Sequence, residues 1–440
     1  MIKKTAIILF TLLCFLMLSW QNIYAEDVPL GQSSEIQKKD EKKEKITGDI
    51  FGEEGGYFHP FLTVEAAYTT NIFFTDKNEE SSVITTIAPG IWIALPRTRE
   101  KLVSVSTSNS SPGGVEYSHL QADESRKLQT YFLYSPSFVF YSGFSDYNYT
   151  NHTLEGFFNY NFGFDVSLEI IDQYNIKSEI NDDGQGKLLD EYQDNLFSVV
   201  ASWEPSPKFK FRFDFSNYFT KFDKSVNGFR DRQDNSFAAY IFYRFKPKTS
   251  AFIEYEYAVI DYDSYSNSDS TEKRYYAGID WEVSAKSKGR VKAGFLEKEF
   301  DLDSNRGEQG FSMEAQLQHA ITPKSTFIIN ANRKYHETKL LDSYFIETTG
   351  ISAAFLLRFS RKWSGAINAS YRRETYTGSD QNGTIDERVD DIYGIGPAFK
   401  FDAKKWLVFE GGLHYTARDS NYDIYDYENG LIYLRMRIDL

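Results

Sequence analysis

Residues 208–216 read Lys-Phe-Lys-Phe-Arg-Phe-Asp-Phe-Ser, and this stretch decides the fold. Phenylalanine occupies positions 209, 211, 213 and 215, whereas charged residues occupy positions 210, 212 and 214. Side chains on a β-strand point alternately to its two faces, while the residues of one helix face recur every three or four positions. The stretch therefore predicts a β-strand with one apolar and one charged face.

The same alternation extends over residues 273–283 and 310–321. These runs are about 12 residues long, whereas strands of soluble proteins usually have about five or six residues. A strand tilted by about 45° crosses the hydrocarbon layer of a membrane in about 9–11 residues. The length of the runs therefore indicates strands that span a membrane.

Short basic turns recur through the second half of the chain at intervals of roughly 40 residues, the scale of a structural repeat. They are Pro207-Lys208, Pro247-Lys248, Lys286 to Lys288, Pro323-Lys324, Arg361-Lys362 and Lys404-Lys405. The opposite strand ends carry longer polar loops at 176–191, 223–234, 261–271, 378–388 and 419–427. Short periplasmic turns and long external loops are typical of outer-membrane barrels.

The fold predicted from these segments is all-β: a transmembrane, antiparallel, up-and-down β-barrel of about 18 strands. An even number of strands places both termini in the periplasm. The expected strands are 58–74, 82–94, 134–147, 151–162, 164–176, 191–204, 208–222, 235–245, 249–262, 272–284, 289–302, 309–321, 325–338, 344–358, 363–377, 389–402, 405–418 and 428–439.

The N-terminal part predicts export and a short tether before the barrel. Residues 1–25 have two lysines, an apolar run and a small residue at the end, the pattern of a signal peptide. Residues 26–56 are rich in charge, lack apolar periodicity and are expected to be a disordered periplasmic tether. Cys14 is the only cysteine and falls in the signal peptide, so the mature chain offers neither disulfides nor a thiolate metal site.

Residues 57–440 are expected to form the barrel, interrupted by an irregular insertion at 96–133. This insertion contains a serine-rich stretch, 104–112, and falls where another short turn is expected. Three interpretations are open: a periplasmic loop, an extra hairpin, or a segment folded into the lumen as a constriction.

The composition supports a membrane barrel and argues against a nucleic-acid partner. Aromatic residues make up 17% of the chain, with 31 Tyr and 37 Phe. Barrels use such residues as girdles at the two membrane interfaces. The formal net charge of −14 argues against nucleic acid, because binding it requires a basic patch.

The polar faces of the expected strands carry charges of both signs and are predicted to line an aqueous lumen. The candidate lumen-lining residues are Lys210, Arg212, Asp214, Glu254, Glu256, Arg274, Asp280, Glu282, Glu314, Arg372, Arg435 and Arg437. Any barrel of this width needs a solvated interior, so these charges support a pore without identifying its cargo. The six histidines are scattered, and we expect no catalytic site, no metal site, no cofactor and no enzymatic activity.

The first two expected strands resemble a known family. His59-Pro60-Phe61-Leu62, Tyr68, Thr70-Asn71-Ile72-Phe73 and the run from Val83 to Gly90 are similar to the opening of a β-barrel porin family found beside exopolysaccharide biosynthesis and export genes. That family usually has Asp where this chain has Thr70. The insertion at 96–133 is a second departure.

The resemblance implies a barrel in the outer membrane of a Gram-negative bacterium that acts as the final conduit in polysaccharide secretion. Its expected partners are outer-membrane lipid and lipopolysaccharide, the barrel-assembly machinery and periplasmic polysaccharide-export components. The residues themselves leave two other hypotheses open. One is a general diffusion porin for small solutes, and the other is a non-conducting surface barrel whose loops bind a partner.

Overall fold

The computed structural model of this 440-residue chain describes residues 56–98, 105–115, 127–181, 187–223, 225–264, 268–284, 286–301, 307–341, 343–378 and 387–440. The expected signal peptide (1–25) and, apart from Gly56, the expected tether (26–56) lie outside the described residues. Within the described ranges, no helix is both long enough and apolar enough to cross a membrane.

The described residues contain 18 strands in one sheet. In chain order these are β1 (Phe58–Thr69), β2 (Ser82–Leu95), β3 (Leu128–Tyr141), β4 (Tyr149–Phe162), β5 (Val166–Ile180), β6 (Leu189–Ser206), β7 (Phe209–Phe222), β8 (Arg232–Lys246), β9 (Thr249–Tyr262), β10 (Ser270–Ser284), β11 (Ser287–Phe300), β12 (Glu308–Thr322), β13 (Ser325–His336), β14 (Ser343–Arg358), β15 (Trp363–Gly378), β16 (Arg388–Lys404), β17 (Leu407–Ser420) and β18 (Tyr427–Asp439). Short 3₁₀ helices occur at η2 (Pro112–Gly114), η3 (Ser145–Tyr147), η4 (Ser225–Arg230) and η7 (Asp423–Tyr425).

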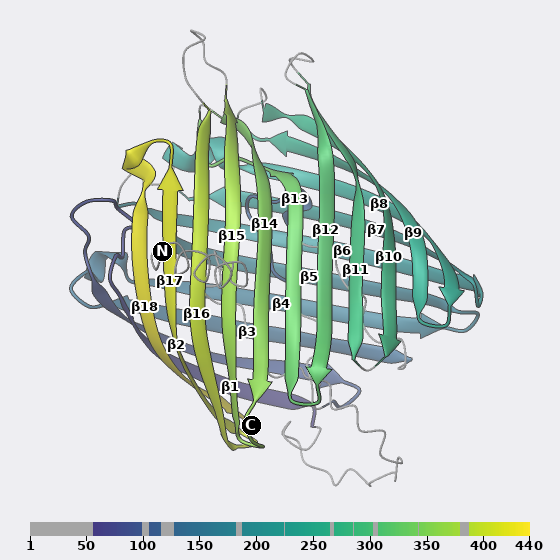
Figure 1. Ribbon diagram of the computed structural model, residues 1–440, viewed down its shortest axis with the longest axis horizontal. Coiled ribbons are helices and arrows are strands. Elements are labelled where there is room, and N and C mark those ends of the chain that lie inside the picture. Colours follow the sequence, from purple (N-terminus) through teal and green to yellow (C-terminus); the bar gives the residue numbers. More distant parts are fainter. Residues whose placement is uncertain are drawn as a thin grey trace, which may run out of the picture.

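Each strand pairs antiparallel with its neighbour in sequence, and β18 pairs with β1, so the sheet closes on itself. The predicted 18-stranded up-and-down barrel is therefore confirmed. In Figure 1 the strands of the near wall, such as β12 to β17, run steeply across those of the far wall, such as β3 to β7. This crossing is the view expected when all strands are tilted against the barrel axis.

The expected position of the third strand is wrong by six residues at each end. Sequence alternation placed it at 134–147, whereas β3 spans Leu128–Tyr141. The chain turns after Tyr141 because Gly143 adopts a left-handed backbone with φ of +83°. The Asn148 side chain then accepts a hydrogen bond from the Tyr141 backbone at 2.7 Å, which closes the turn before β4.

Exposed apolar side chains cover the outer face of the barrel. On β7, Phe213 is 59% exposed, whereas the neighbouring Arg212 is 2% exposed and points inward. Aromatic residues are part of this outer face. Tyr255 and Tyr275 are cross-strand partners on β9 and β10, and Trp363 stacks on Phe401 near the short-turn end. An outward face of apolar and aromatic side chains is the surface that a barrel presents to lipid.

The alternation gives a test of the strand register. Ile279, on the outer face of β10, is 47% exposed, and Leu317 lies on the corresponding face of β12. Replacing either by Arg is expected to lower the free energy of unfolding by about 2–4 kcal/mol if the site is near the membrane midplane. Gln316→Arg, on the inner face, should be tolerated. Urea titration in lipid vesicles measures all three, and equal losses would show that the faces are exchanged.

The seam between β1 and β18 is held by a cluster of polar side chains around Asn71. Asn71 is fully buried, and its side chain donates to the carbonyls of Thr75 (2.7 Å) and Glu428 (3.0 Å). The side-chain oxygen of Asn429 accepts from the Asn71 backbone (3.2 Å) and from the Thr69 hydroxyl (2.7 Å). The bonds to Glu428 and Asn429 join residues more than 350 positions apart in the chain and fix where the last strand meets the first.

Asn71→Ala should weaken the closure of the barrel. The substitution removes the part-buried bonds to the carbonyls of Thr75 and Glu428, each worth about 0.5–1.5 kcal/mol. We expect the temperature at which the barrel loses its compact mobility on SDS gels to fall. Asn217→Ala is the matched control, because it removes a part-buried bond to Asn235 between β7 and β8, far from the seam. An equal fall in both variants would contradict a special role for the seam.

Candidate functional site

Residues 105–115, which we call the strap, lie inside the barrel. Their hydrogen-bond partners are on β5, β6 and β8 and at the residue that follows β13. A segment that contacts such widely separated strands of one closed sheet must cross its interior. Of the three interpretations of the 96–133 insertion, the lumen-folded one fits residues 105–115, whereas residues 128–133 belong to strand β3. Residues 99–104 and 116–126 lie outside the described residues.

The base of the strap rests on an apolar patch of the inner wall. Thr107 and Val115 form an isolated antiparallel bridge that brings the two arms together. Val105 is buried in this patch, and Val115 packs against it. The wall residues of the patch are Trp92, Ala94, Tyr131, Leu133, Phe157, Ile171, Leu196 and Tyr218. Removal of this apolar surface from water favours the docked strap.

The hydroxyl of Thr107 occupies a three-sided polar site on β5 and β6. It donates to the Asp194 carboxylate at 3.1 Å and accepts from Asn175 Nδ2 at 3.2 Å and from Lys177 Nζ at 2.9 Å. Asp194 and Asn175 are almost fully buried. Next to this site, Gln173 Nε2 donates to the Val105 carbonyl at 2.7 Å.

The tip of the strap is bound mainly through its backbone. The Gly113 amide donates to Asp234 at 2.9 Å, and Arg232 donates to the carbonyls of Asn109 (2.8 Å) and Ser111 (3.3 Å). At the far side, the Glu337 amide donates to the Ser110 carbonyl at 2.7 Å. The strap therefore reaches from the β5–β6 wall to the end of β13.

Two glycines allow the strap to lie flat against the wall. Gly113 and Gly114 have φ of +74° and +77°, a region that other residues adopt only at a cost. A Cβ on Gly114 would lie 2.2 Å from Cδ2 of Tyr218. Only glycine lets the backbone approach the ring this closely.

The charged side chains of the wall beside the strap are paired with each other. Asp194 lies 3.5 Å from Lys177, Asp234 lies 3.1 Å from Arg232, and Glu337 lies 2.7 Å from Lys298. Burial opposes ionisation of the Glu337 carboxyl, but Lys298 and Arg232 outweigh it and hold its pKa below the ordinary value. The strap sequence between Val105 and Val115 carries no charged residue, so it is bound by hydrogen bonds and packing alone.

The sequence-predicted lumen residues lie on the inner face, and 11 of the 12 have an ion-pair partner among the described residues. The exception is Glu282, which is exposed at the short-turn end of β10. The pairs are Lys210–Glu204, Arg212–Asp214, Glu254–Lys292, Glu256–Arg274, Asp280–Arg290, Glu314–Lys292, Arg372–Glu374, Arg435–Glu65 and Arg437–Asp439.

Sequence reasoning did not find the residues that bind the strap. Asp194, Arg232 and Asp234 were not among the candidates, and neither was Glu337. Arg232 and Asp234 are two positions apart on one strand, the same spacing as Arg212 and Asp214. That spacing places both side chains on one face, and it is the signal that could have indicated them.

The described residues do not bring the histidines together, nor do they contain a group of three or more side chains arranged to hold a metal ion. His59 stacks on Trp92 with ring centroids 3.5 Å apart, and His336 lies beside the serines of the strap. His119 lies outside the described residues.

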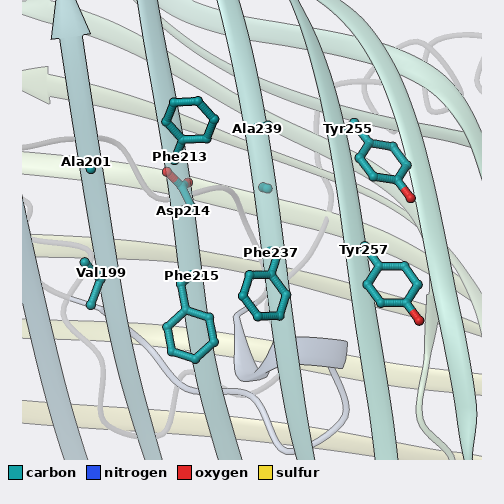
Figure 2. A pocket seen from close by; sticks show the side chains of 10 residues that line it. Val199, Ala201, Phe213, Asp214, Phe215, Phe237, Ala239, Tyr255 and Tyr257 are labelled. Carbon is teal, nitrogen blue, oxygen red and sulfur yellow. The ribbon is translucent and has the colours of Figure 1, made fainter.

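A shallow depression of about 340 Å³ lies on the outer face of β6 to β9, away from the strap's binding residues. Figure 2 shows its aromatic rim, with Phe213, Phe215 and Phe237 around the small residues Ala201 and Ala239. Because its surface is almost wholly apolar and belongs to the exposed aromatic face, we interpret it as a contact for lipid chains.

Residues 211–440, just over half of the chain, match the family model described as "Putative beta-barrel porin 2". The chain belongs to this family. The family suggested by residues 59–90 is thus confirmed by a match that lies wholly C-terminal to them. No curated protein matches the sequence of this porin.

Solved outer-membrane proteins resemble the porin only distantly. The outer membrane protein OpdK from Pseudomonas aeruginosa is 8% identical, with 87% of this chain and 99% of OpdK covered and a TM-score of 0.45. OpdQ from Pseudomonas aeruginosa is also 8% identical, with 87% and 99% covered and a TM-score of 0.44. A bacterial polysaccharide outer membrane secretin is 8% identical, with 87% and 98% covered and a TM-score of 0.36.

Gly114→Ala should unseat the strap and increase the single-channel conductance of the porin in planar bilayers. The new methyl group would collide with Tyr218, and the left-handed backbone would cost a further 1–2 kcal/mol or so. Gly143→Ala is the matched control, because its φ is +83° but nothing lies within 4 Å of the added Cβ. If both variants conduct like the wild type, the strap does not narrow the pore.

Proposed function

We propose that this porin is a passive outer-membrane conduit through which a polysaccharide leaves the cell. The observation that carries the proposal is the polar, charge-paired interior of the barrel, crossed by an uncharged strap rich in serine. Barrels of 16–18 strands enclose a water-filled channel. Such a channel can admit an extended, hydrated polymer.

The pairing of the lumen charges favours a hydroxyl-rich cargo over a small ion. Arg372 lies 2.8 Å from Glu374, and Arg435 lies 2.7 Å from Glu65, with all four side chains partly exposed. Each positive group is offset by a nearby carboxylate, so the wall exerts a weak net field on a passing chain. Paired charges still donate and accept hydrogen bonds, which suits sugar hydroxyls.

The proposed orientation places the short turns and both termini in the periplasm and the long loops outside. The support for it is the loop asymmetry, because outer-membrane barrels have short periplasmic turns and longer external loops. Residues 1–25 are then the signal peptide, and the barrel inserts with the help of the assembly machinery. Lipopolysaccharide contacts the outer face towards the long loops, and periplasmic export components contact the short-turn end.

We propose transport without covalent chemistry. The interior charges pair with each other, and the chain supplies no nucleotide-binding Gly-Lys motif. Movement of the polymer would then be driven by its synthesis or by periplasmic components.

Two measurements test the proposed function. Purified porin in planar bilayers is expected to give stepwise currents with weak ion selectivity. Deleting the gene is expected to reduce surface polysaccharide, with recovery on complementation. A folded barrel without current would contradict a conduit of any kind. Normal currents together with normal polysaccharide secretion would instead indicate a diffusion porin for small solutes.

A further inference from the structure

We propose that the strap occupies a saccharide-binding track on the β5–β8 wall of the lumen, and that the exported polymer binds where the strap is docked. This inference rests on the proposed function and deepens it. The ligand class is an uncharged or weakly charged, hydroxyl-rich chain. The strap is itself such a chain, because residues 105–114 include five hydroxyl side chains and no charged one.

The site around Thr107 is built to hold a hydroxyl group. One hydroxyl accepts from an amide and an ammonium group and donates to a carboxylate, with all three distances between 2.9 and 3.2 Å. A hydroxyl has one donor and two acceptor positions, and this arrangement uses all of them. A sugar hydroxyl presents the same three positions, so it can replace the Thr107 side chain without changing the wall.

The track remains intact when the strap leaves it. Asn175 donates to Asp194 at 2.7 Å, and Lys177 lies 3.5 Å from the same carboxylate. Further along, Arg232 lies 3.1 Å from Asp234. Because these groups already pair with each other, undocking leaves none of these charges alone. A buried charge without a partner would make exchange costly, and the track avoids that situation.

The floor of the track adds a flat surface to these polar groups. Tyr218 lies directly under Gly114. Beside it, on the adjoining strands β3 and β4, Tyr131 and Phe157 stack with ring centroids 5.1 Å apart in the same patch. Ligand sites combine an apolar or aromatic lining with a few placed polar groups. A pyranose ring has apolar C–H faces and a polar edge, so it matches a floor of this kind.

The charges along the track balance. Lys177 and Arg232 face Asp194 and Asp234, so the groups that contact the strap carry two positive and two negative charges. A strongly anionic polymer would gain little net electrostatic attraction from such a wall. A neutral chain would gain hydrogen bonds from both signs.

The first test fixes the strap in place with a disulfide. A Cβ on Gly113 would lie 3.4 Å from the Cβ of Ser236, close to the 3.5–4.5 Å that disulfides require. The mature chain has no other cysteine, so Gly113→Cys with Ser236→Cys can form only this bond within one barrel. The measurement is block of single-channel current by maltohexaose, a neutral glucose oligomer used as the probe.

Oxidation is expected to abolish block by maltohexaose, and reduction is expected to restore it in the same channels. The reduced double variant controls for the backbone change at Gly113. Polyethylene glycol of similar size, which has no hydroxyls along its chain, reports exclusion by size alone. Equal block by maltohexaose in the oxidised and reduced states would overturn the proposal, because the sugar would then bind elsewhere.

The second test examines the wall directly, in a full-length barrel whose strap residues 106–114 are replaced by a short glycine linker. In this background Asp194→Asn is expected to weaken maltohexaose block by about tenfold, the size of one lost hydrogen bond to a charged group. Glu410→Gln, which makes the same change of charge on β17, outside the β5–β8 wall, should leave block unchanged. Equal effects of the two variants would overturn the proposal. If the linker barrel does not fold, the disulfide test decides alone.

These results separate failure of the track from failure of the proposed function. Suppose that the channels conduct and secrete polysaccharide normally, but block by maltohexaose changes neither with the disulfide nor with Asp194→Asn. That result would contradict the track and support the conduit. A porin without current, or a gene deletion that leaves secretion unchanged, would contradict the proposed polysaccharide conduit itself.

Discussion

Closure of the sheet between β1 and β18 is the constraint on which the rest of this molecule depends. A peptide group inside a lipid bilayer has no water to bond, so a sheet is stable there only if it has no free edge. Nine residue pairs join the two strands, and the Asn71 cluster extends the connection beyond the last pair. Once the sheet is closed, strict alternation sends one set of side chains to lipid and the other to the interior.

The interior encloses many charged side chains in one space. Opposite charges form ion pairs there, often between residues two apart on one strand, as in Arg212 with Asp214 and Arg388 with Asp390. This pairing lets the wall be polar without a strong field of one sign. It also lets an uncharged strap dock by hydrogen bonds and apolar packing.

Sequence alternation predicted the fold well because each barrel strand repeats a local, two-residue pattern. The number of strands, their faces and the short turns all follow from it. The strap could not be predicted in the same way, because Thr107 and Gly113 contact residues 87 and 121 positions away and carry no periodic signal. The start of β3 was misplaced because the insertion before it hides where alternation resumes. The candidate lumen residues followed from alternation, but their partners on neighbouring strands depend on register, which only the closed sheet fixes.

The most direct test of the account is chemical modification of single cysteines while current is recorded through one channel. Arg372→Cys lies on the inner face, and Phe213→Cys lies on the outer face. A charged, water-soluble thiol reagent is expected to change the current through the Arg372→Cys channel and to leave the Phe213→Cys channel unchanged. No current from the folded barrel, or the same response at both positions, would contradict a conduit lined by the polar faces of these strands.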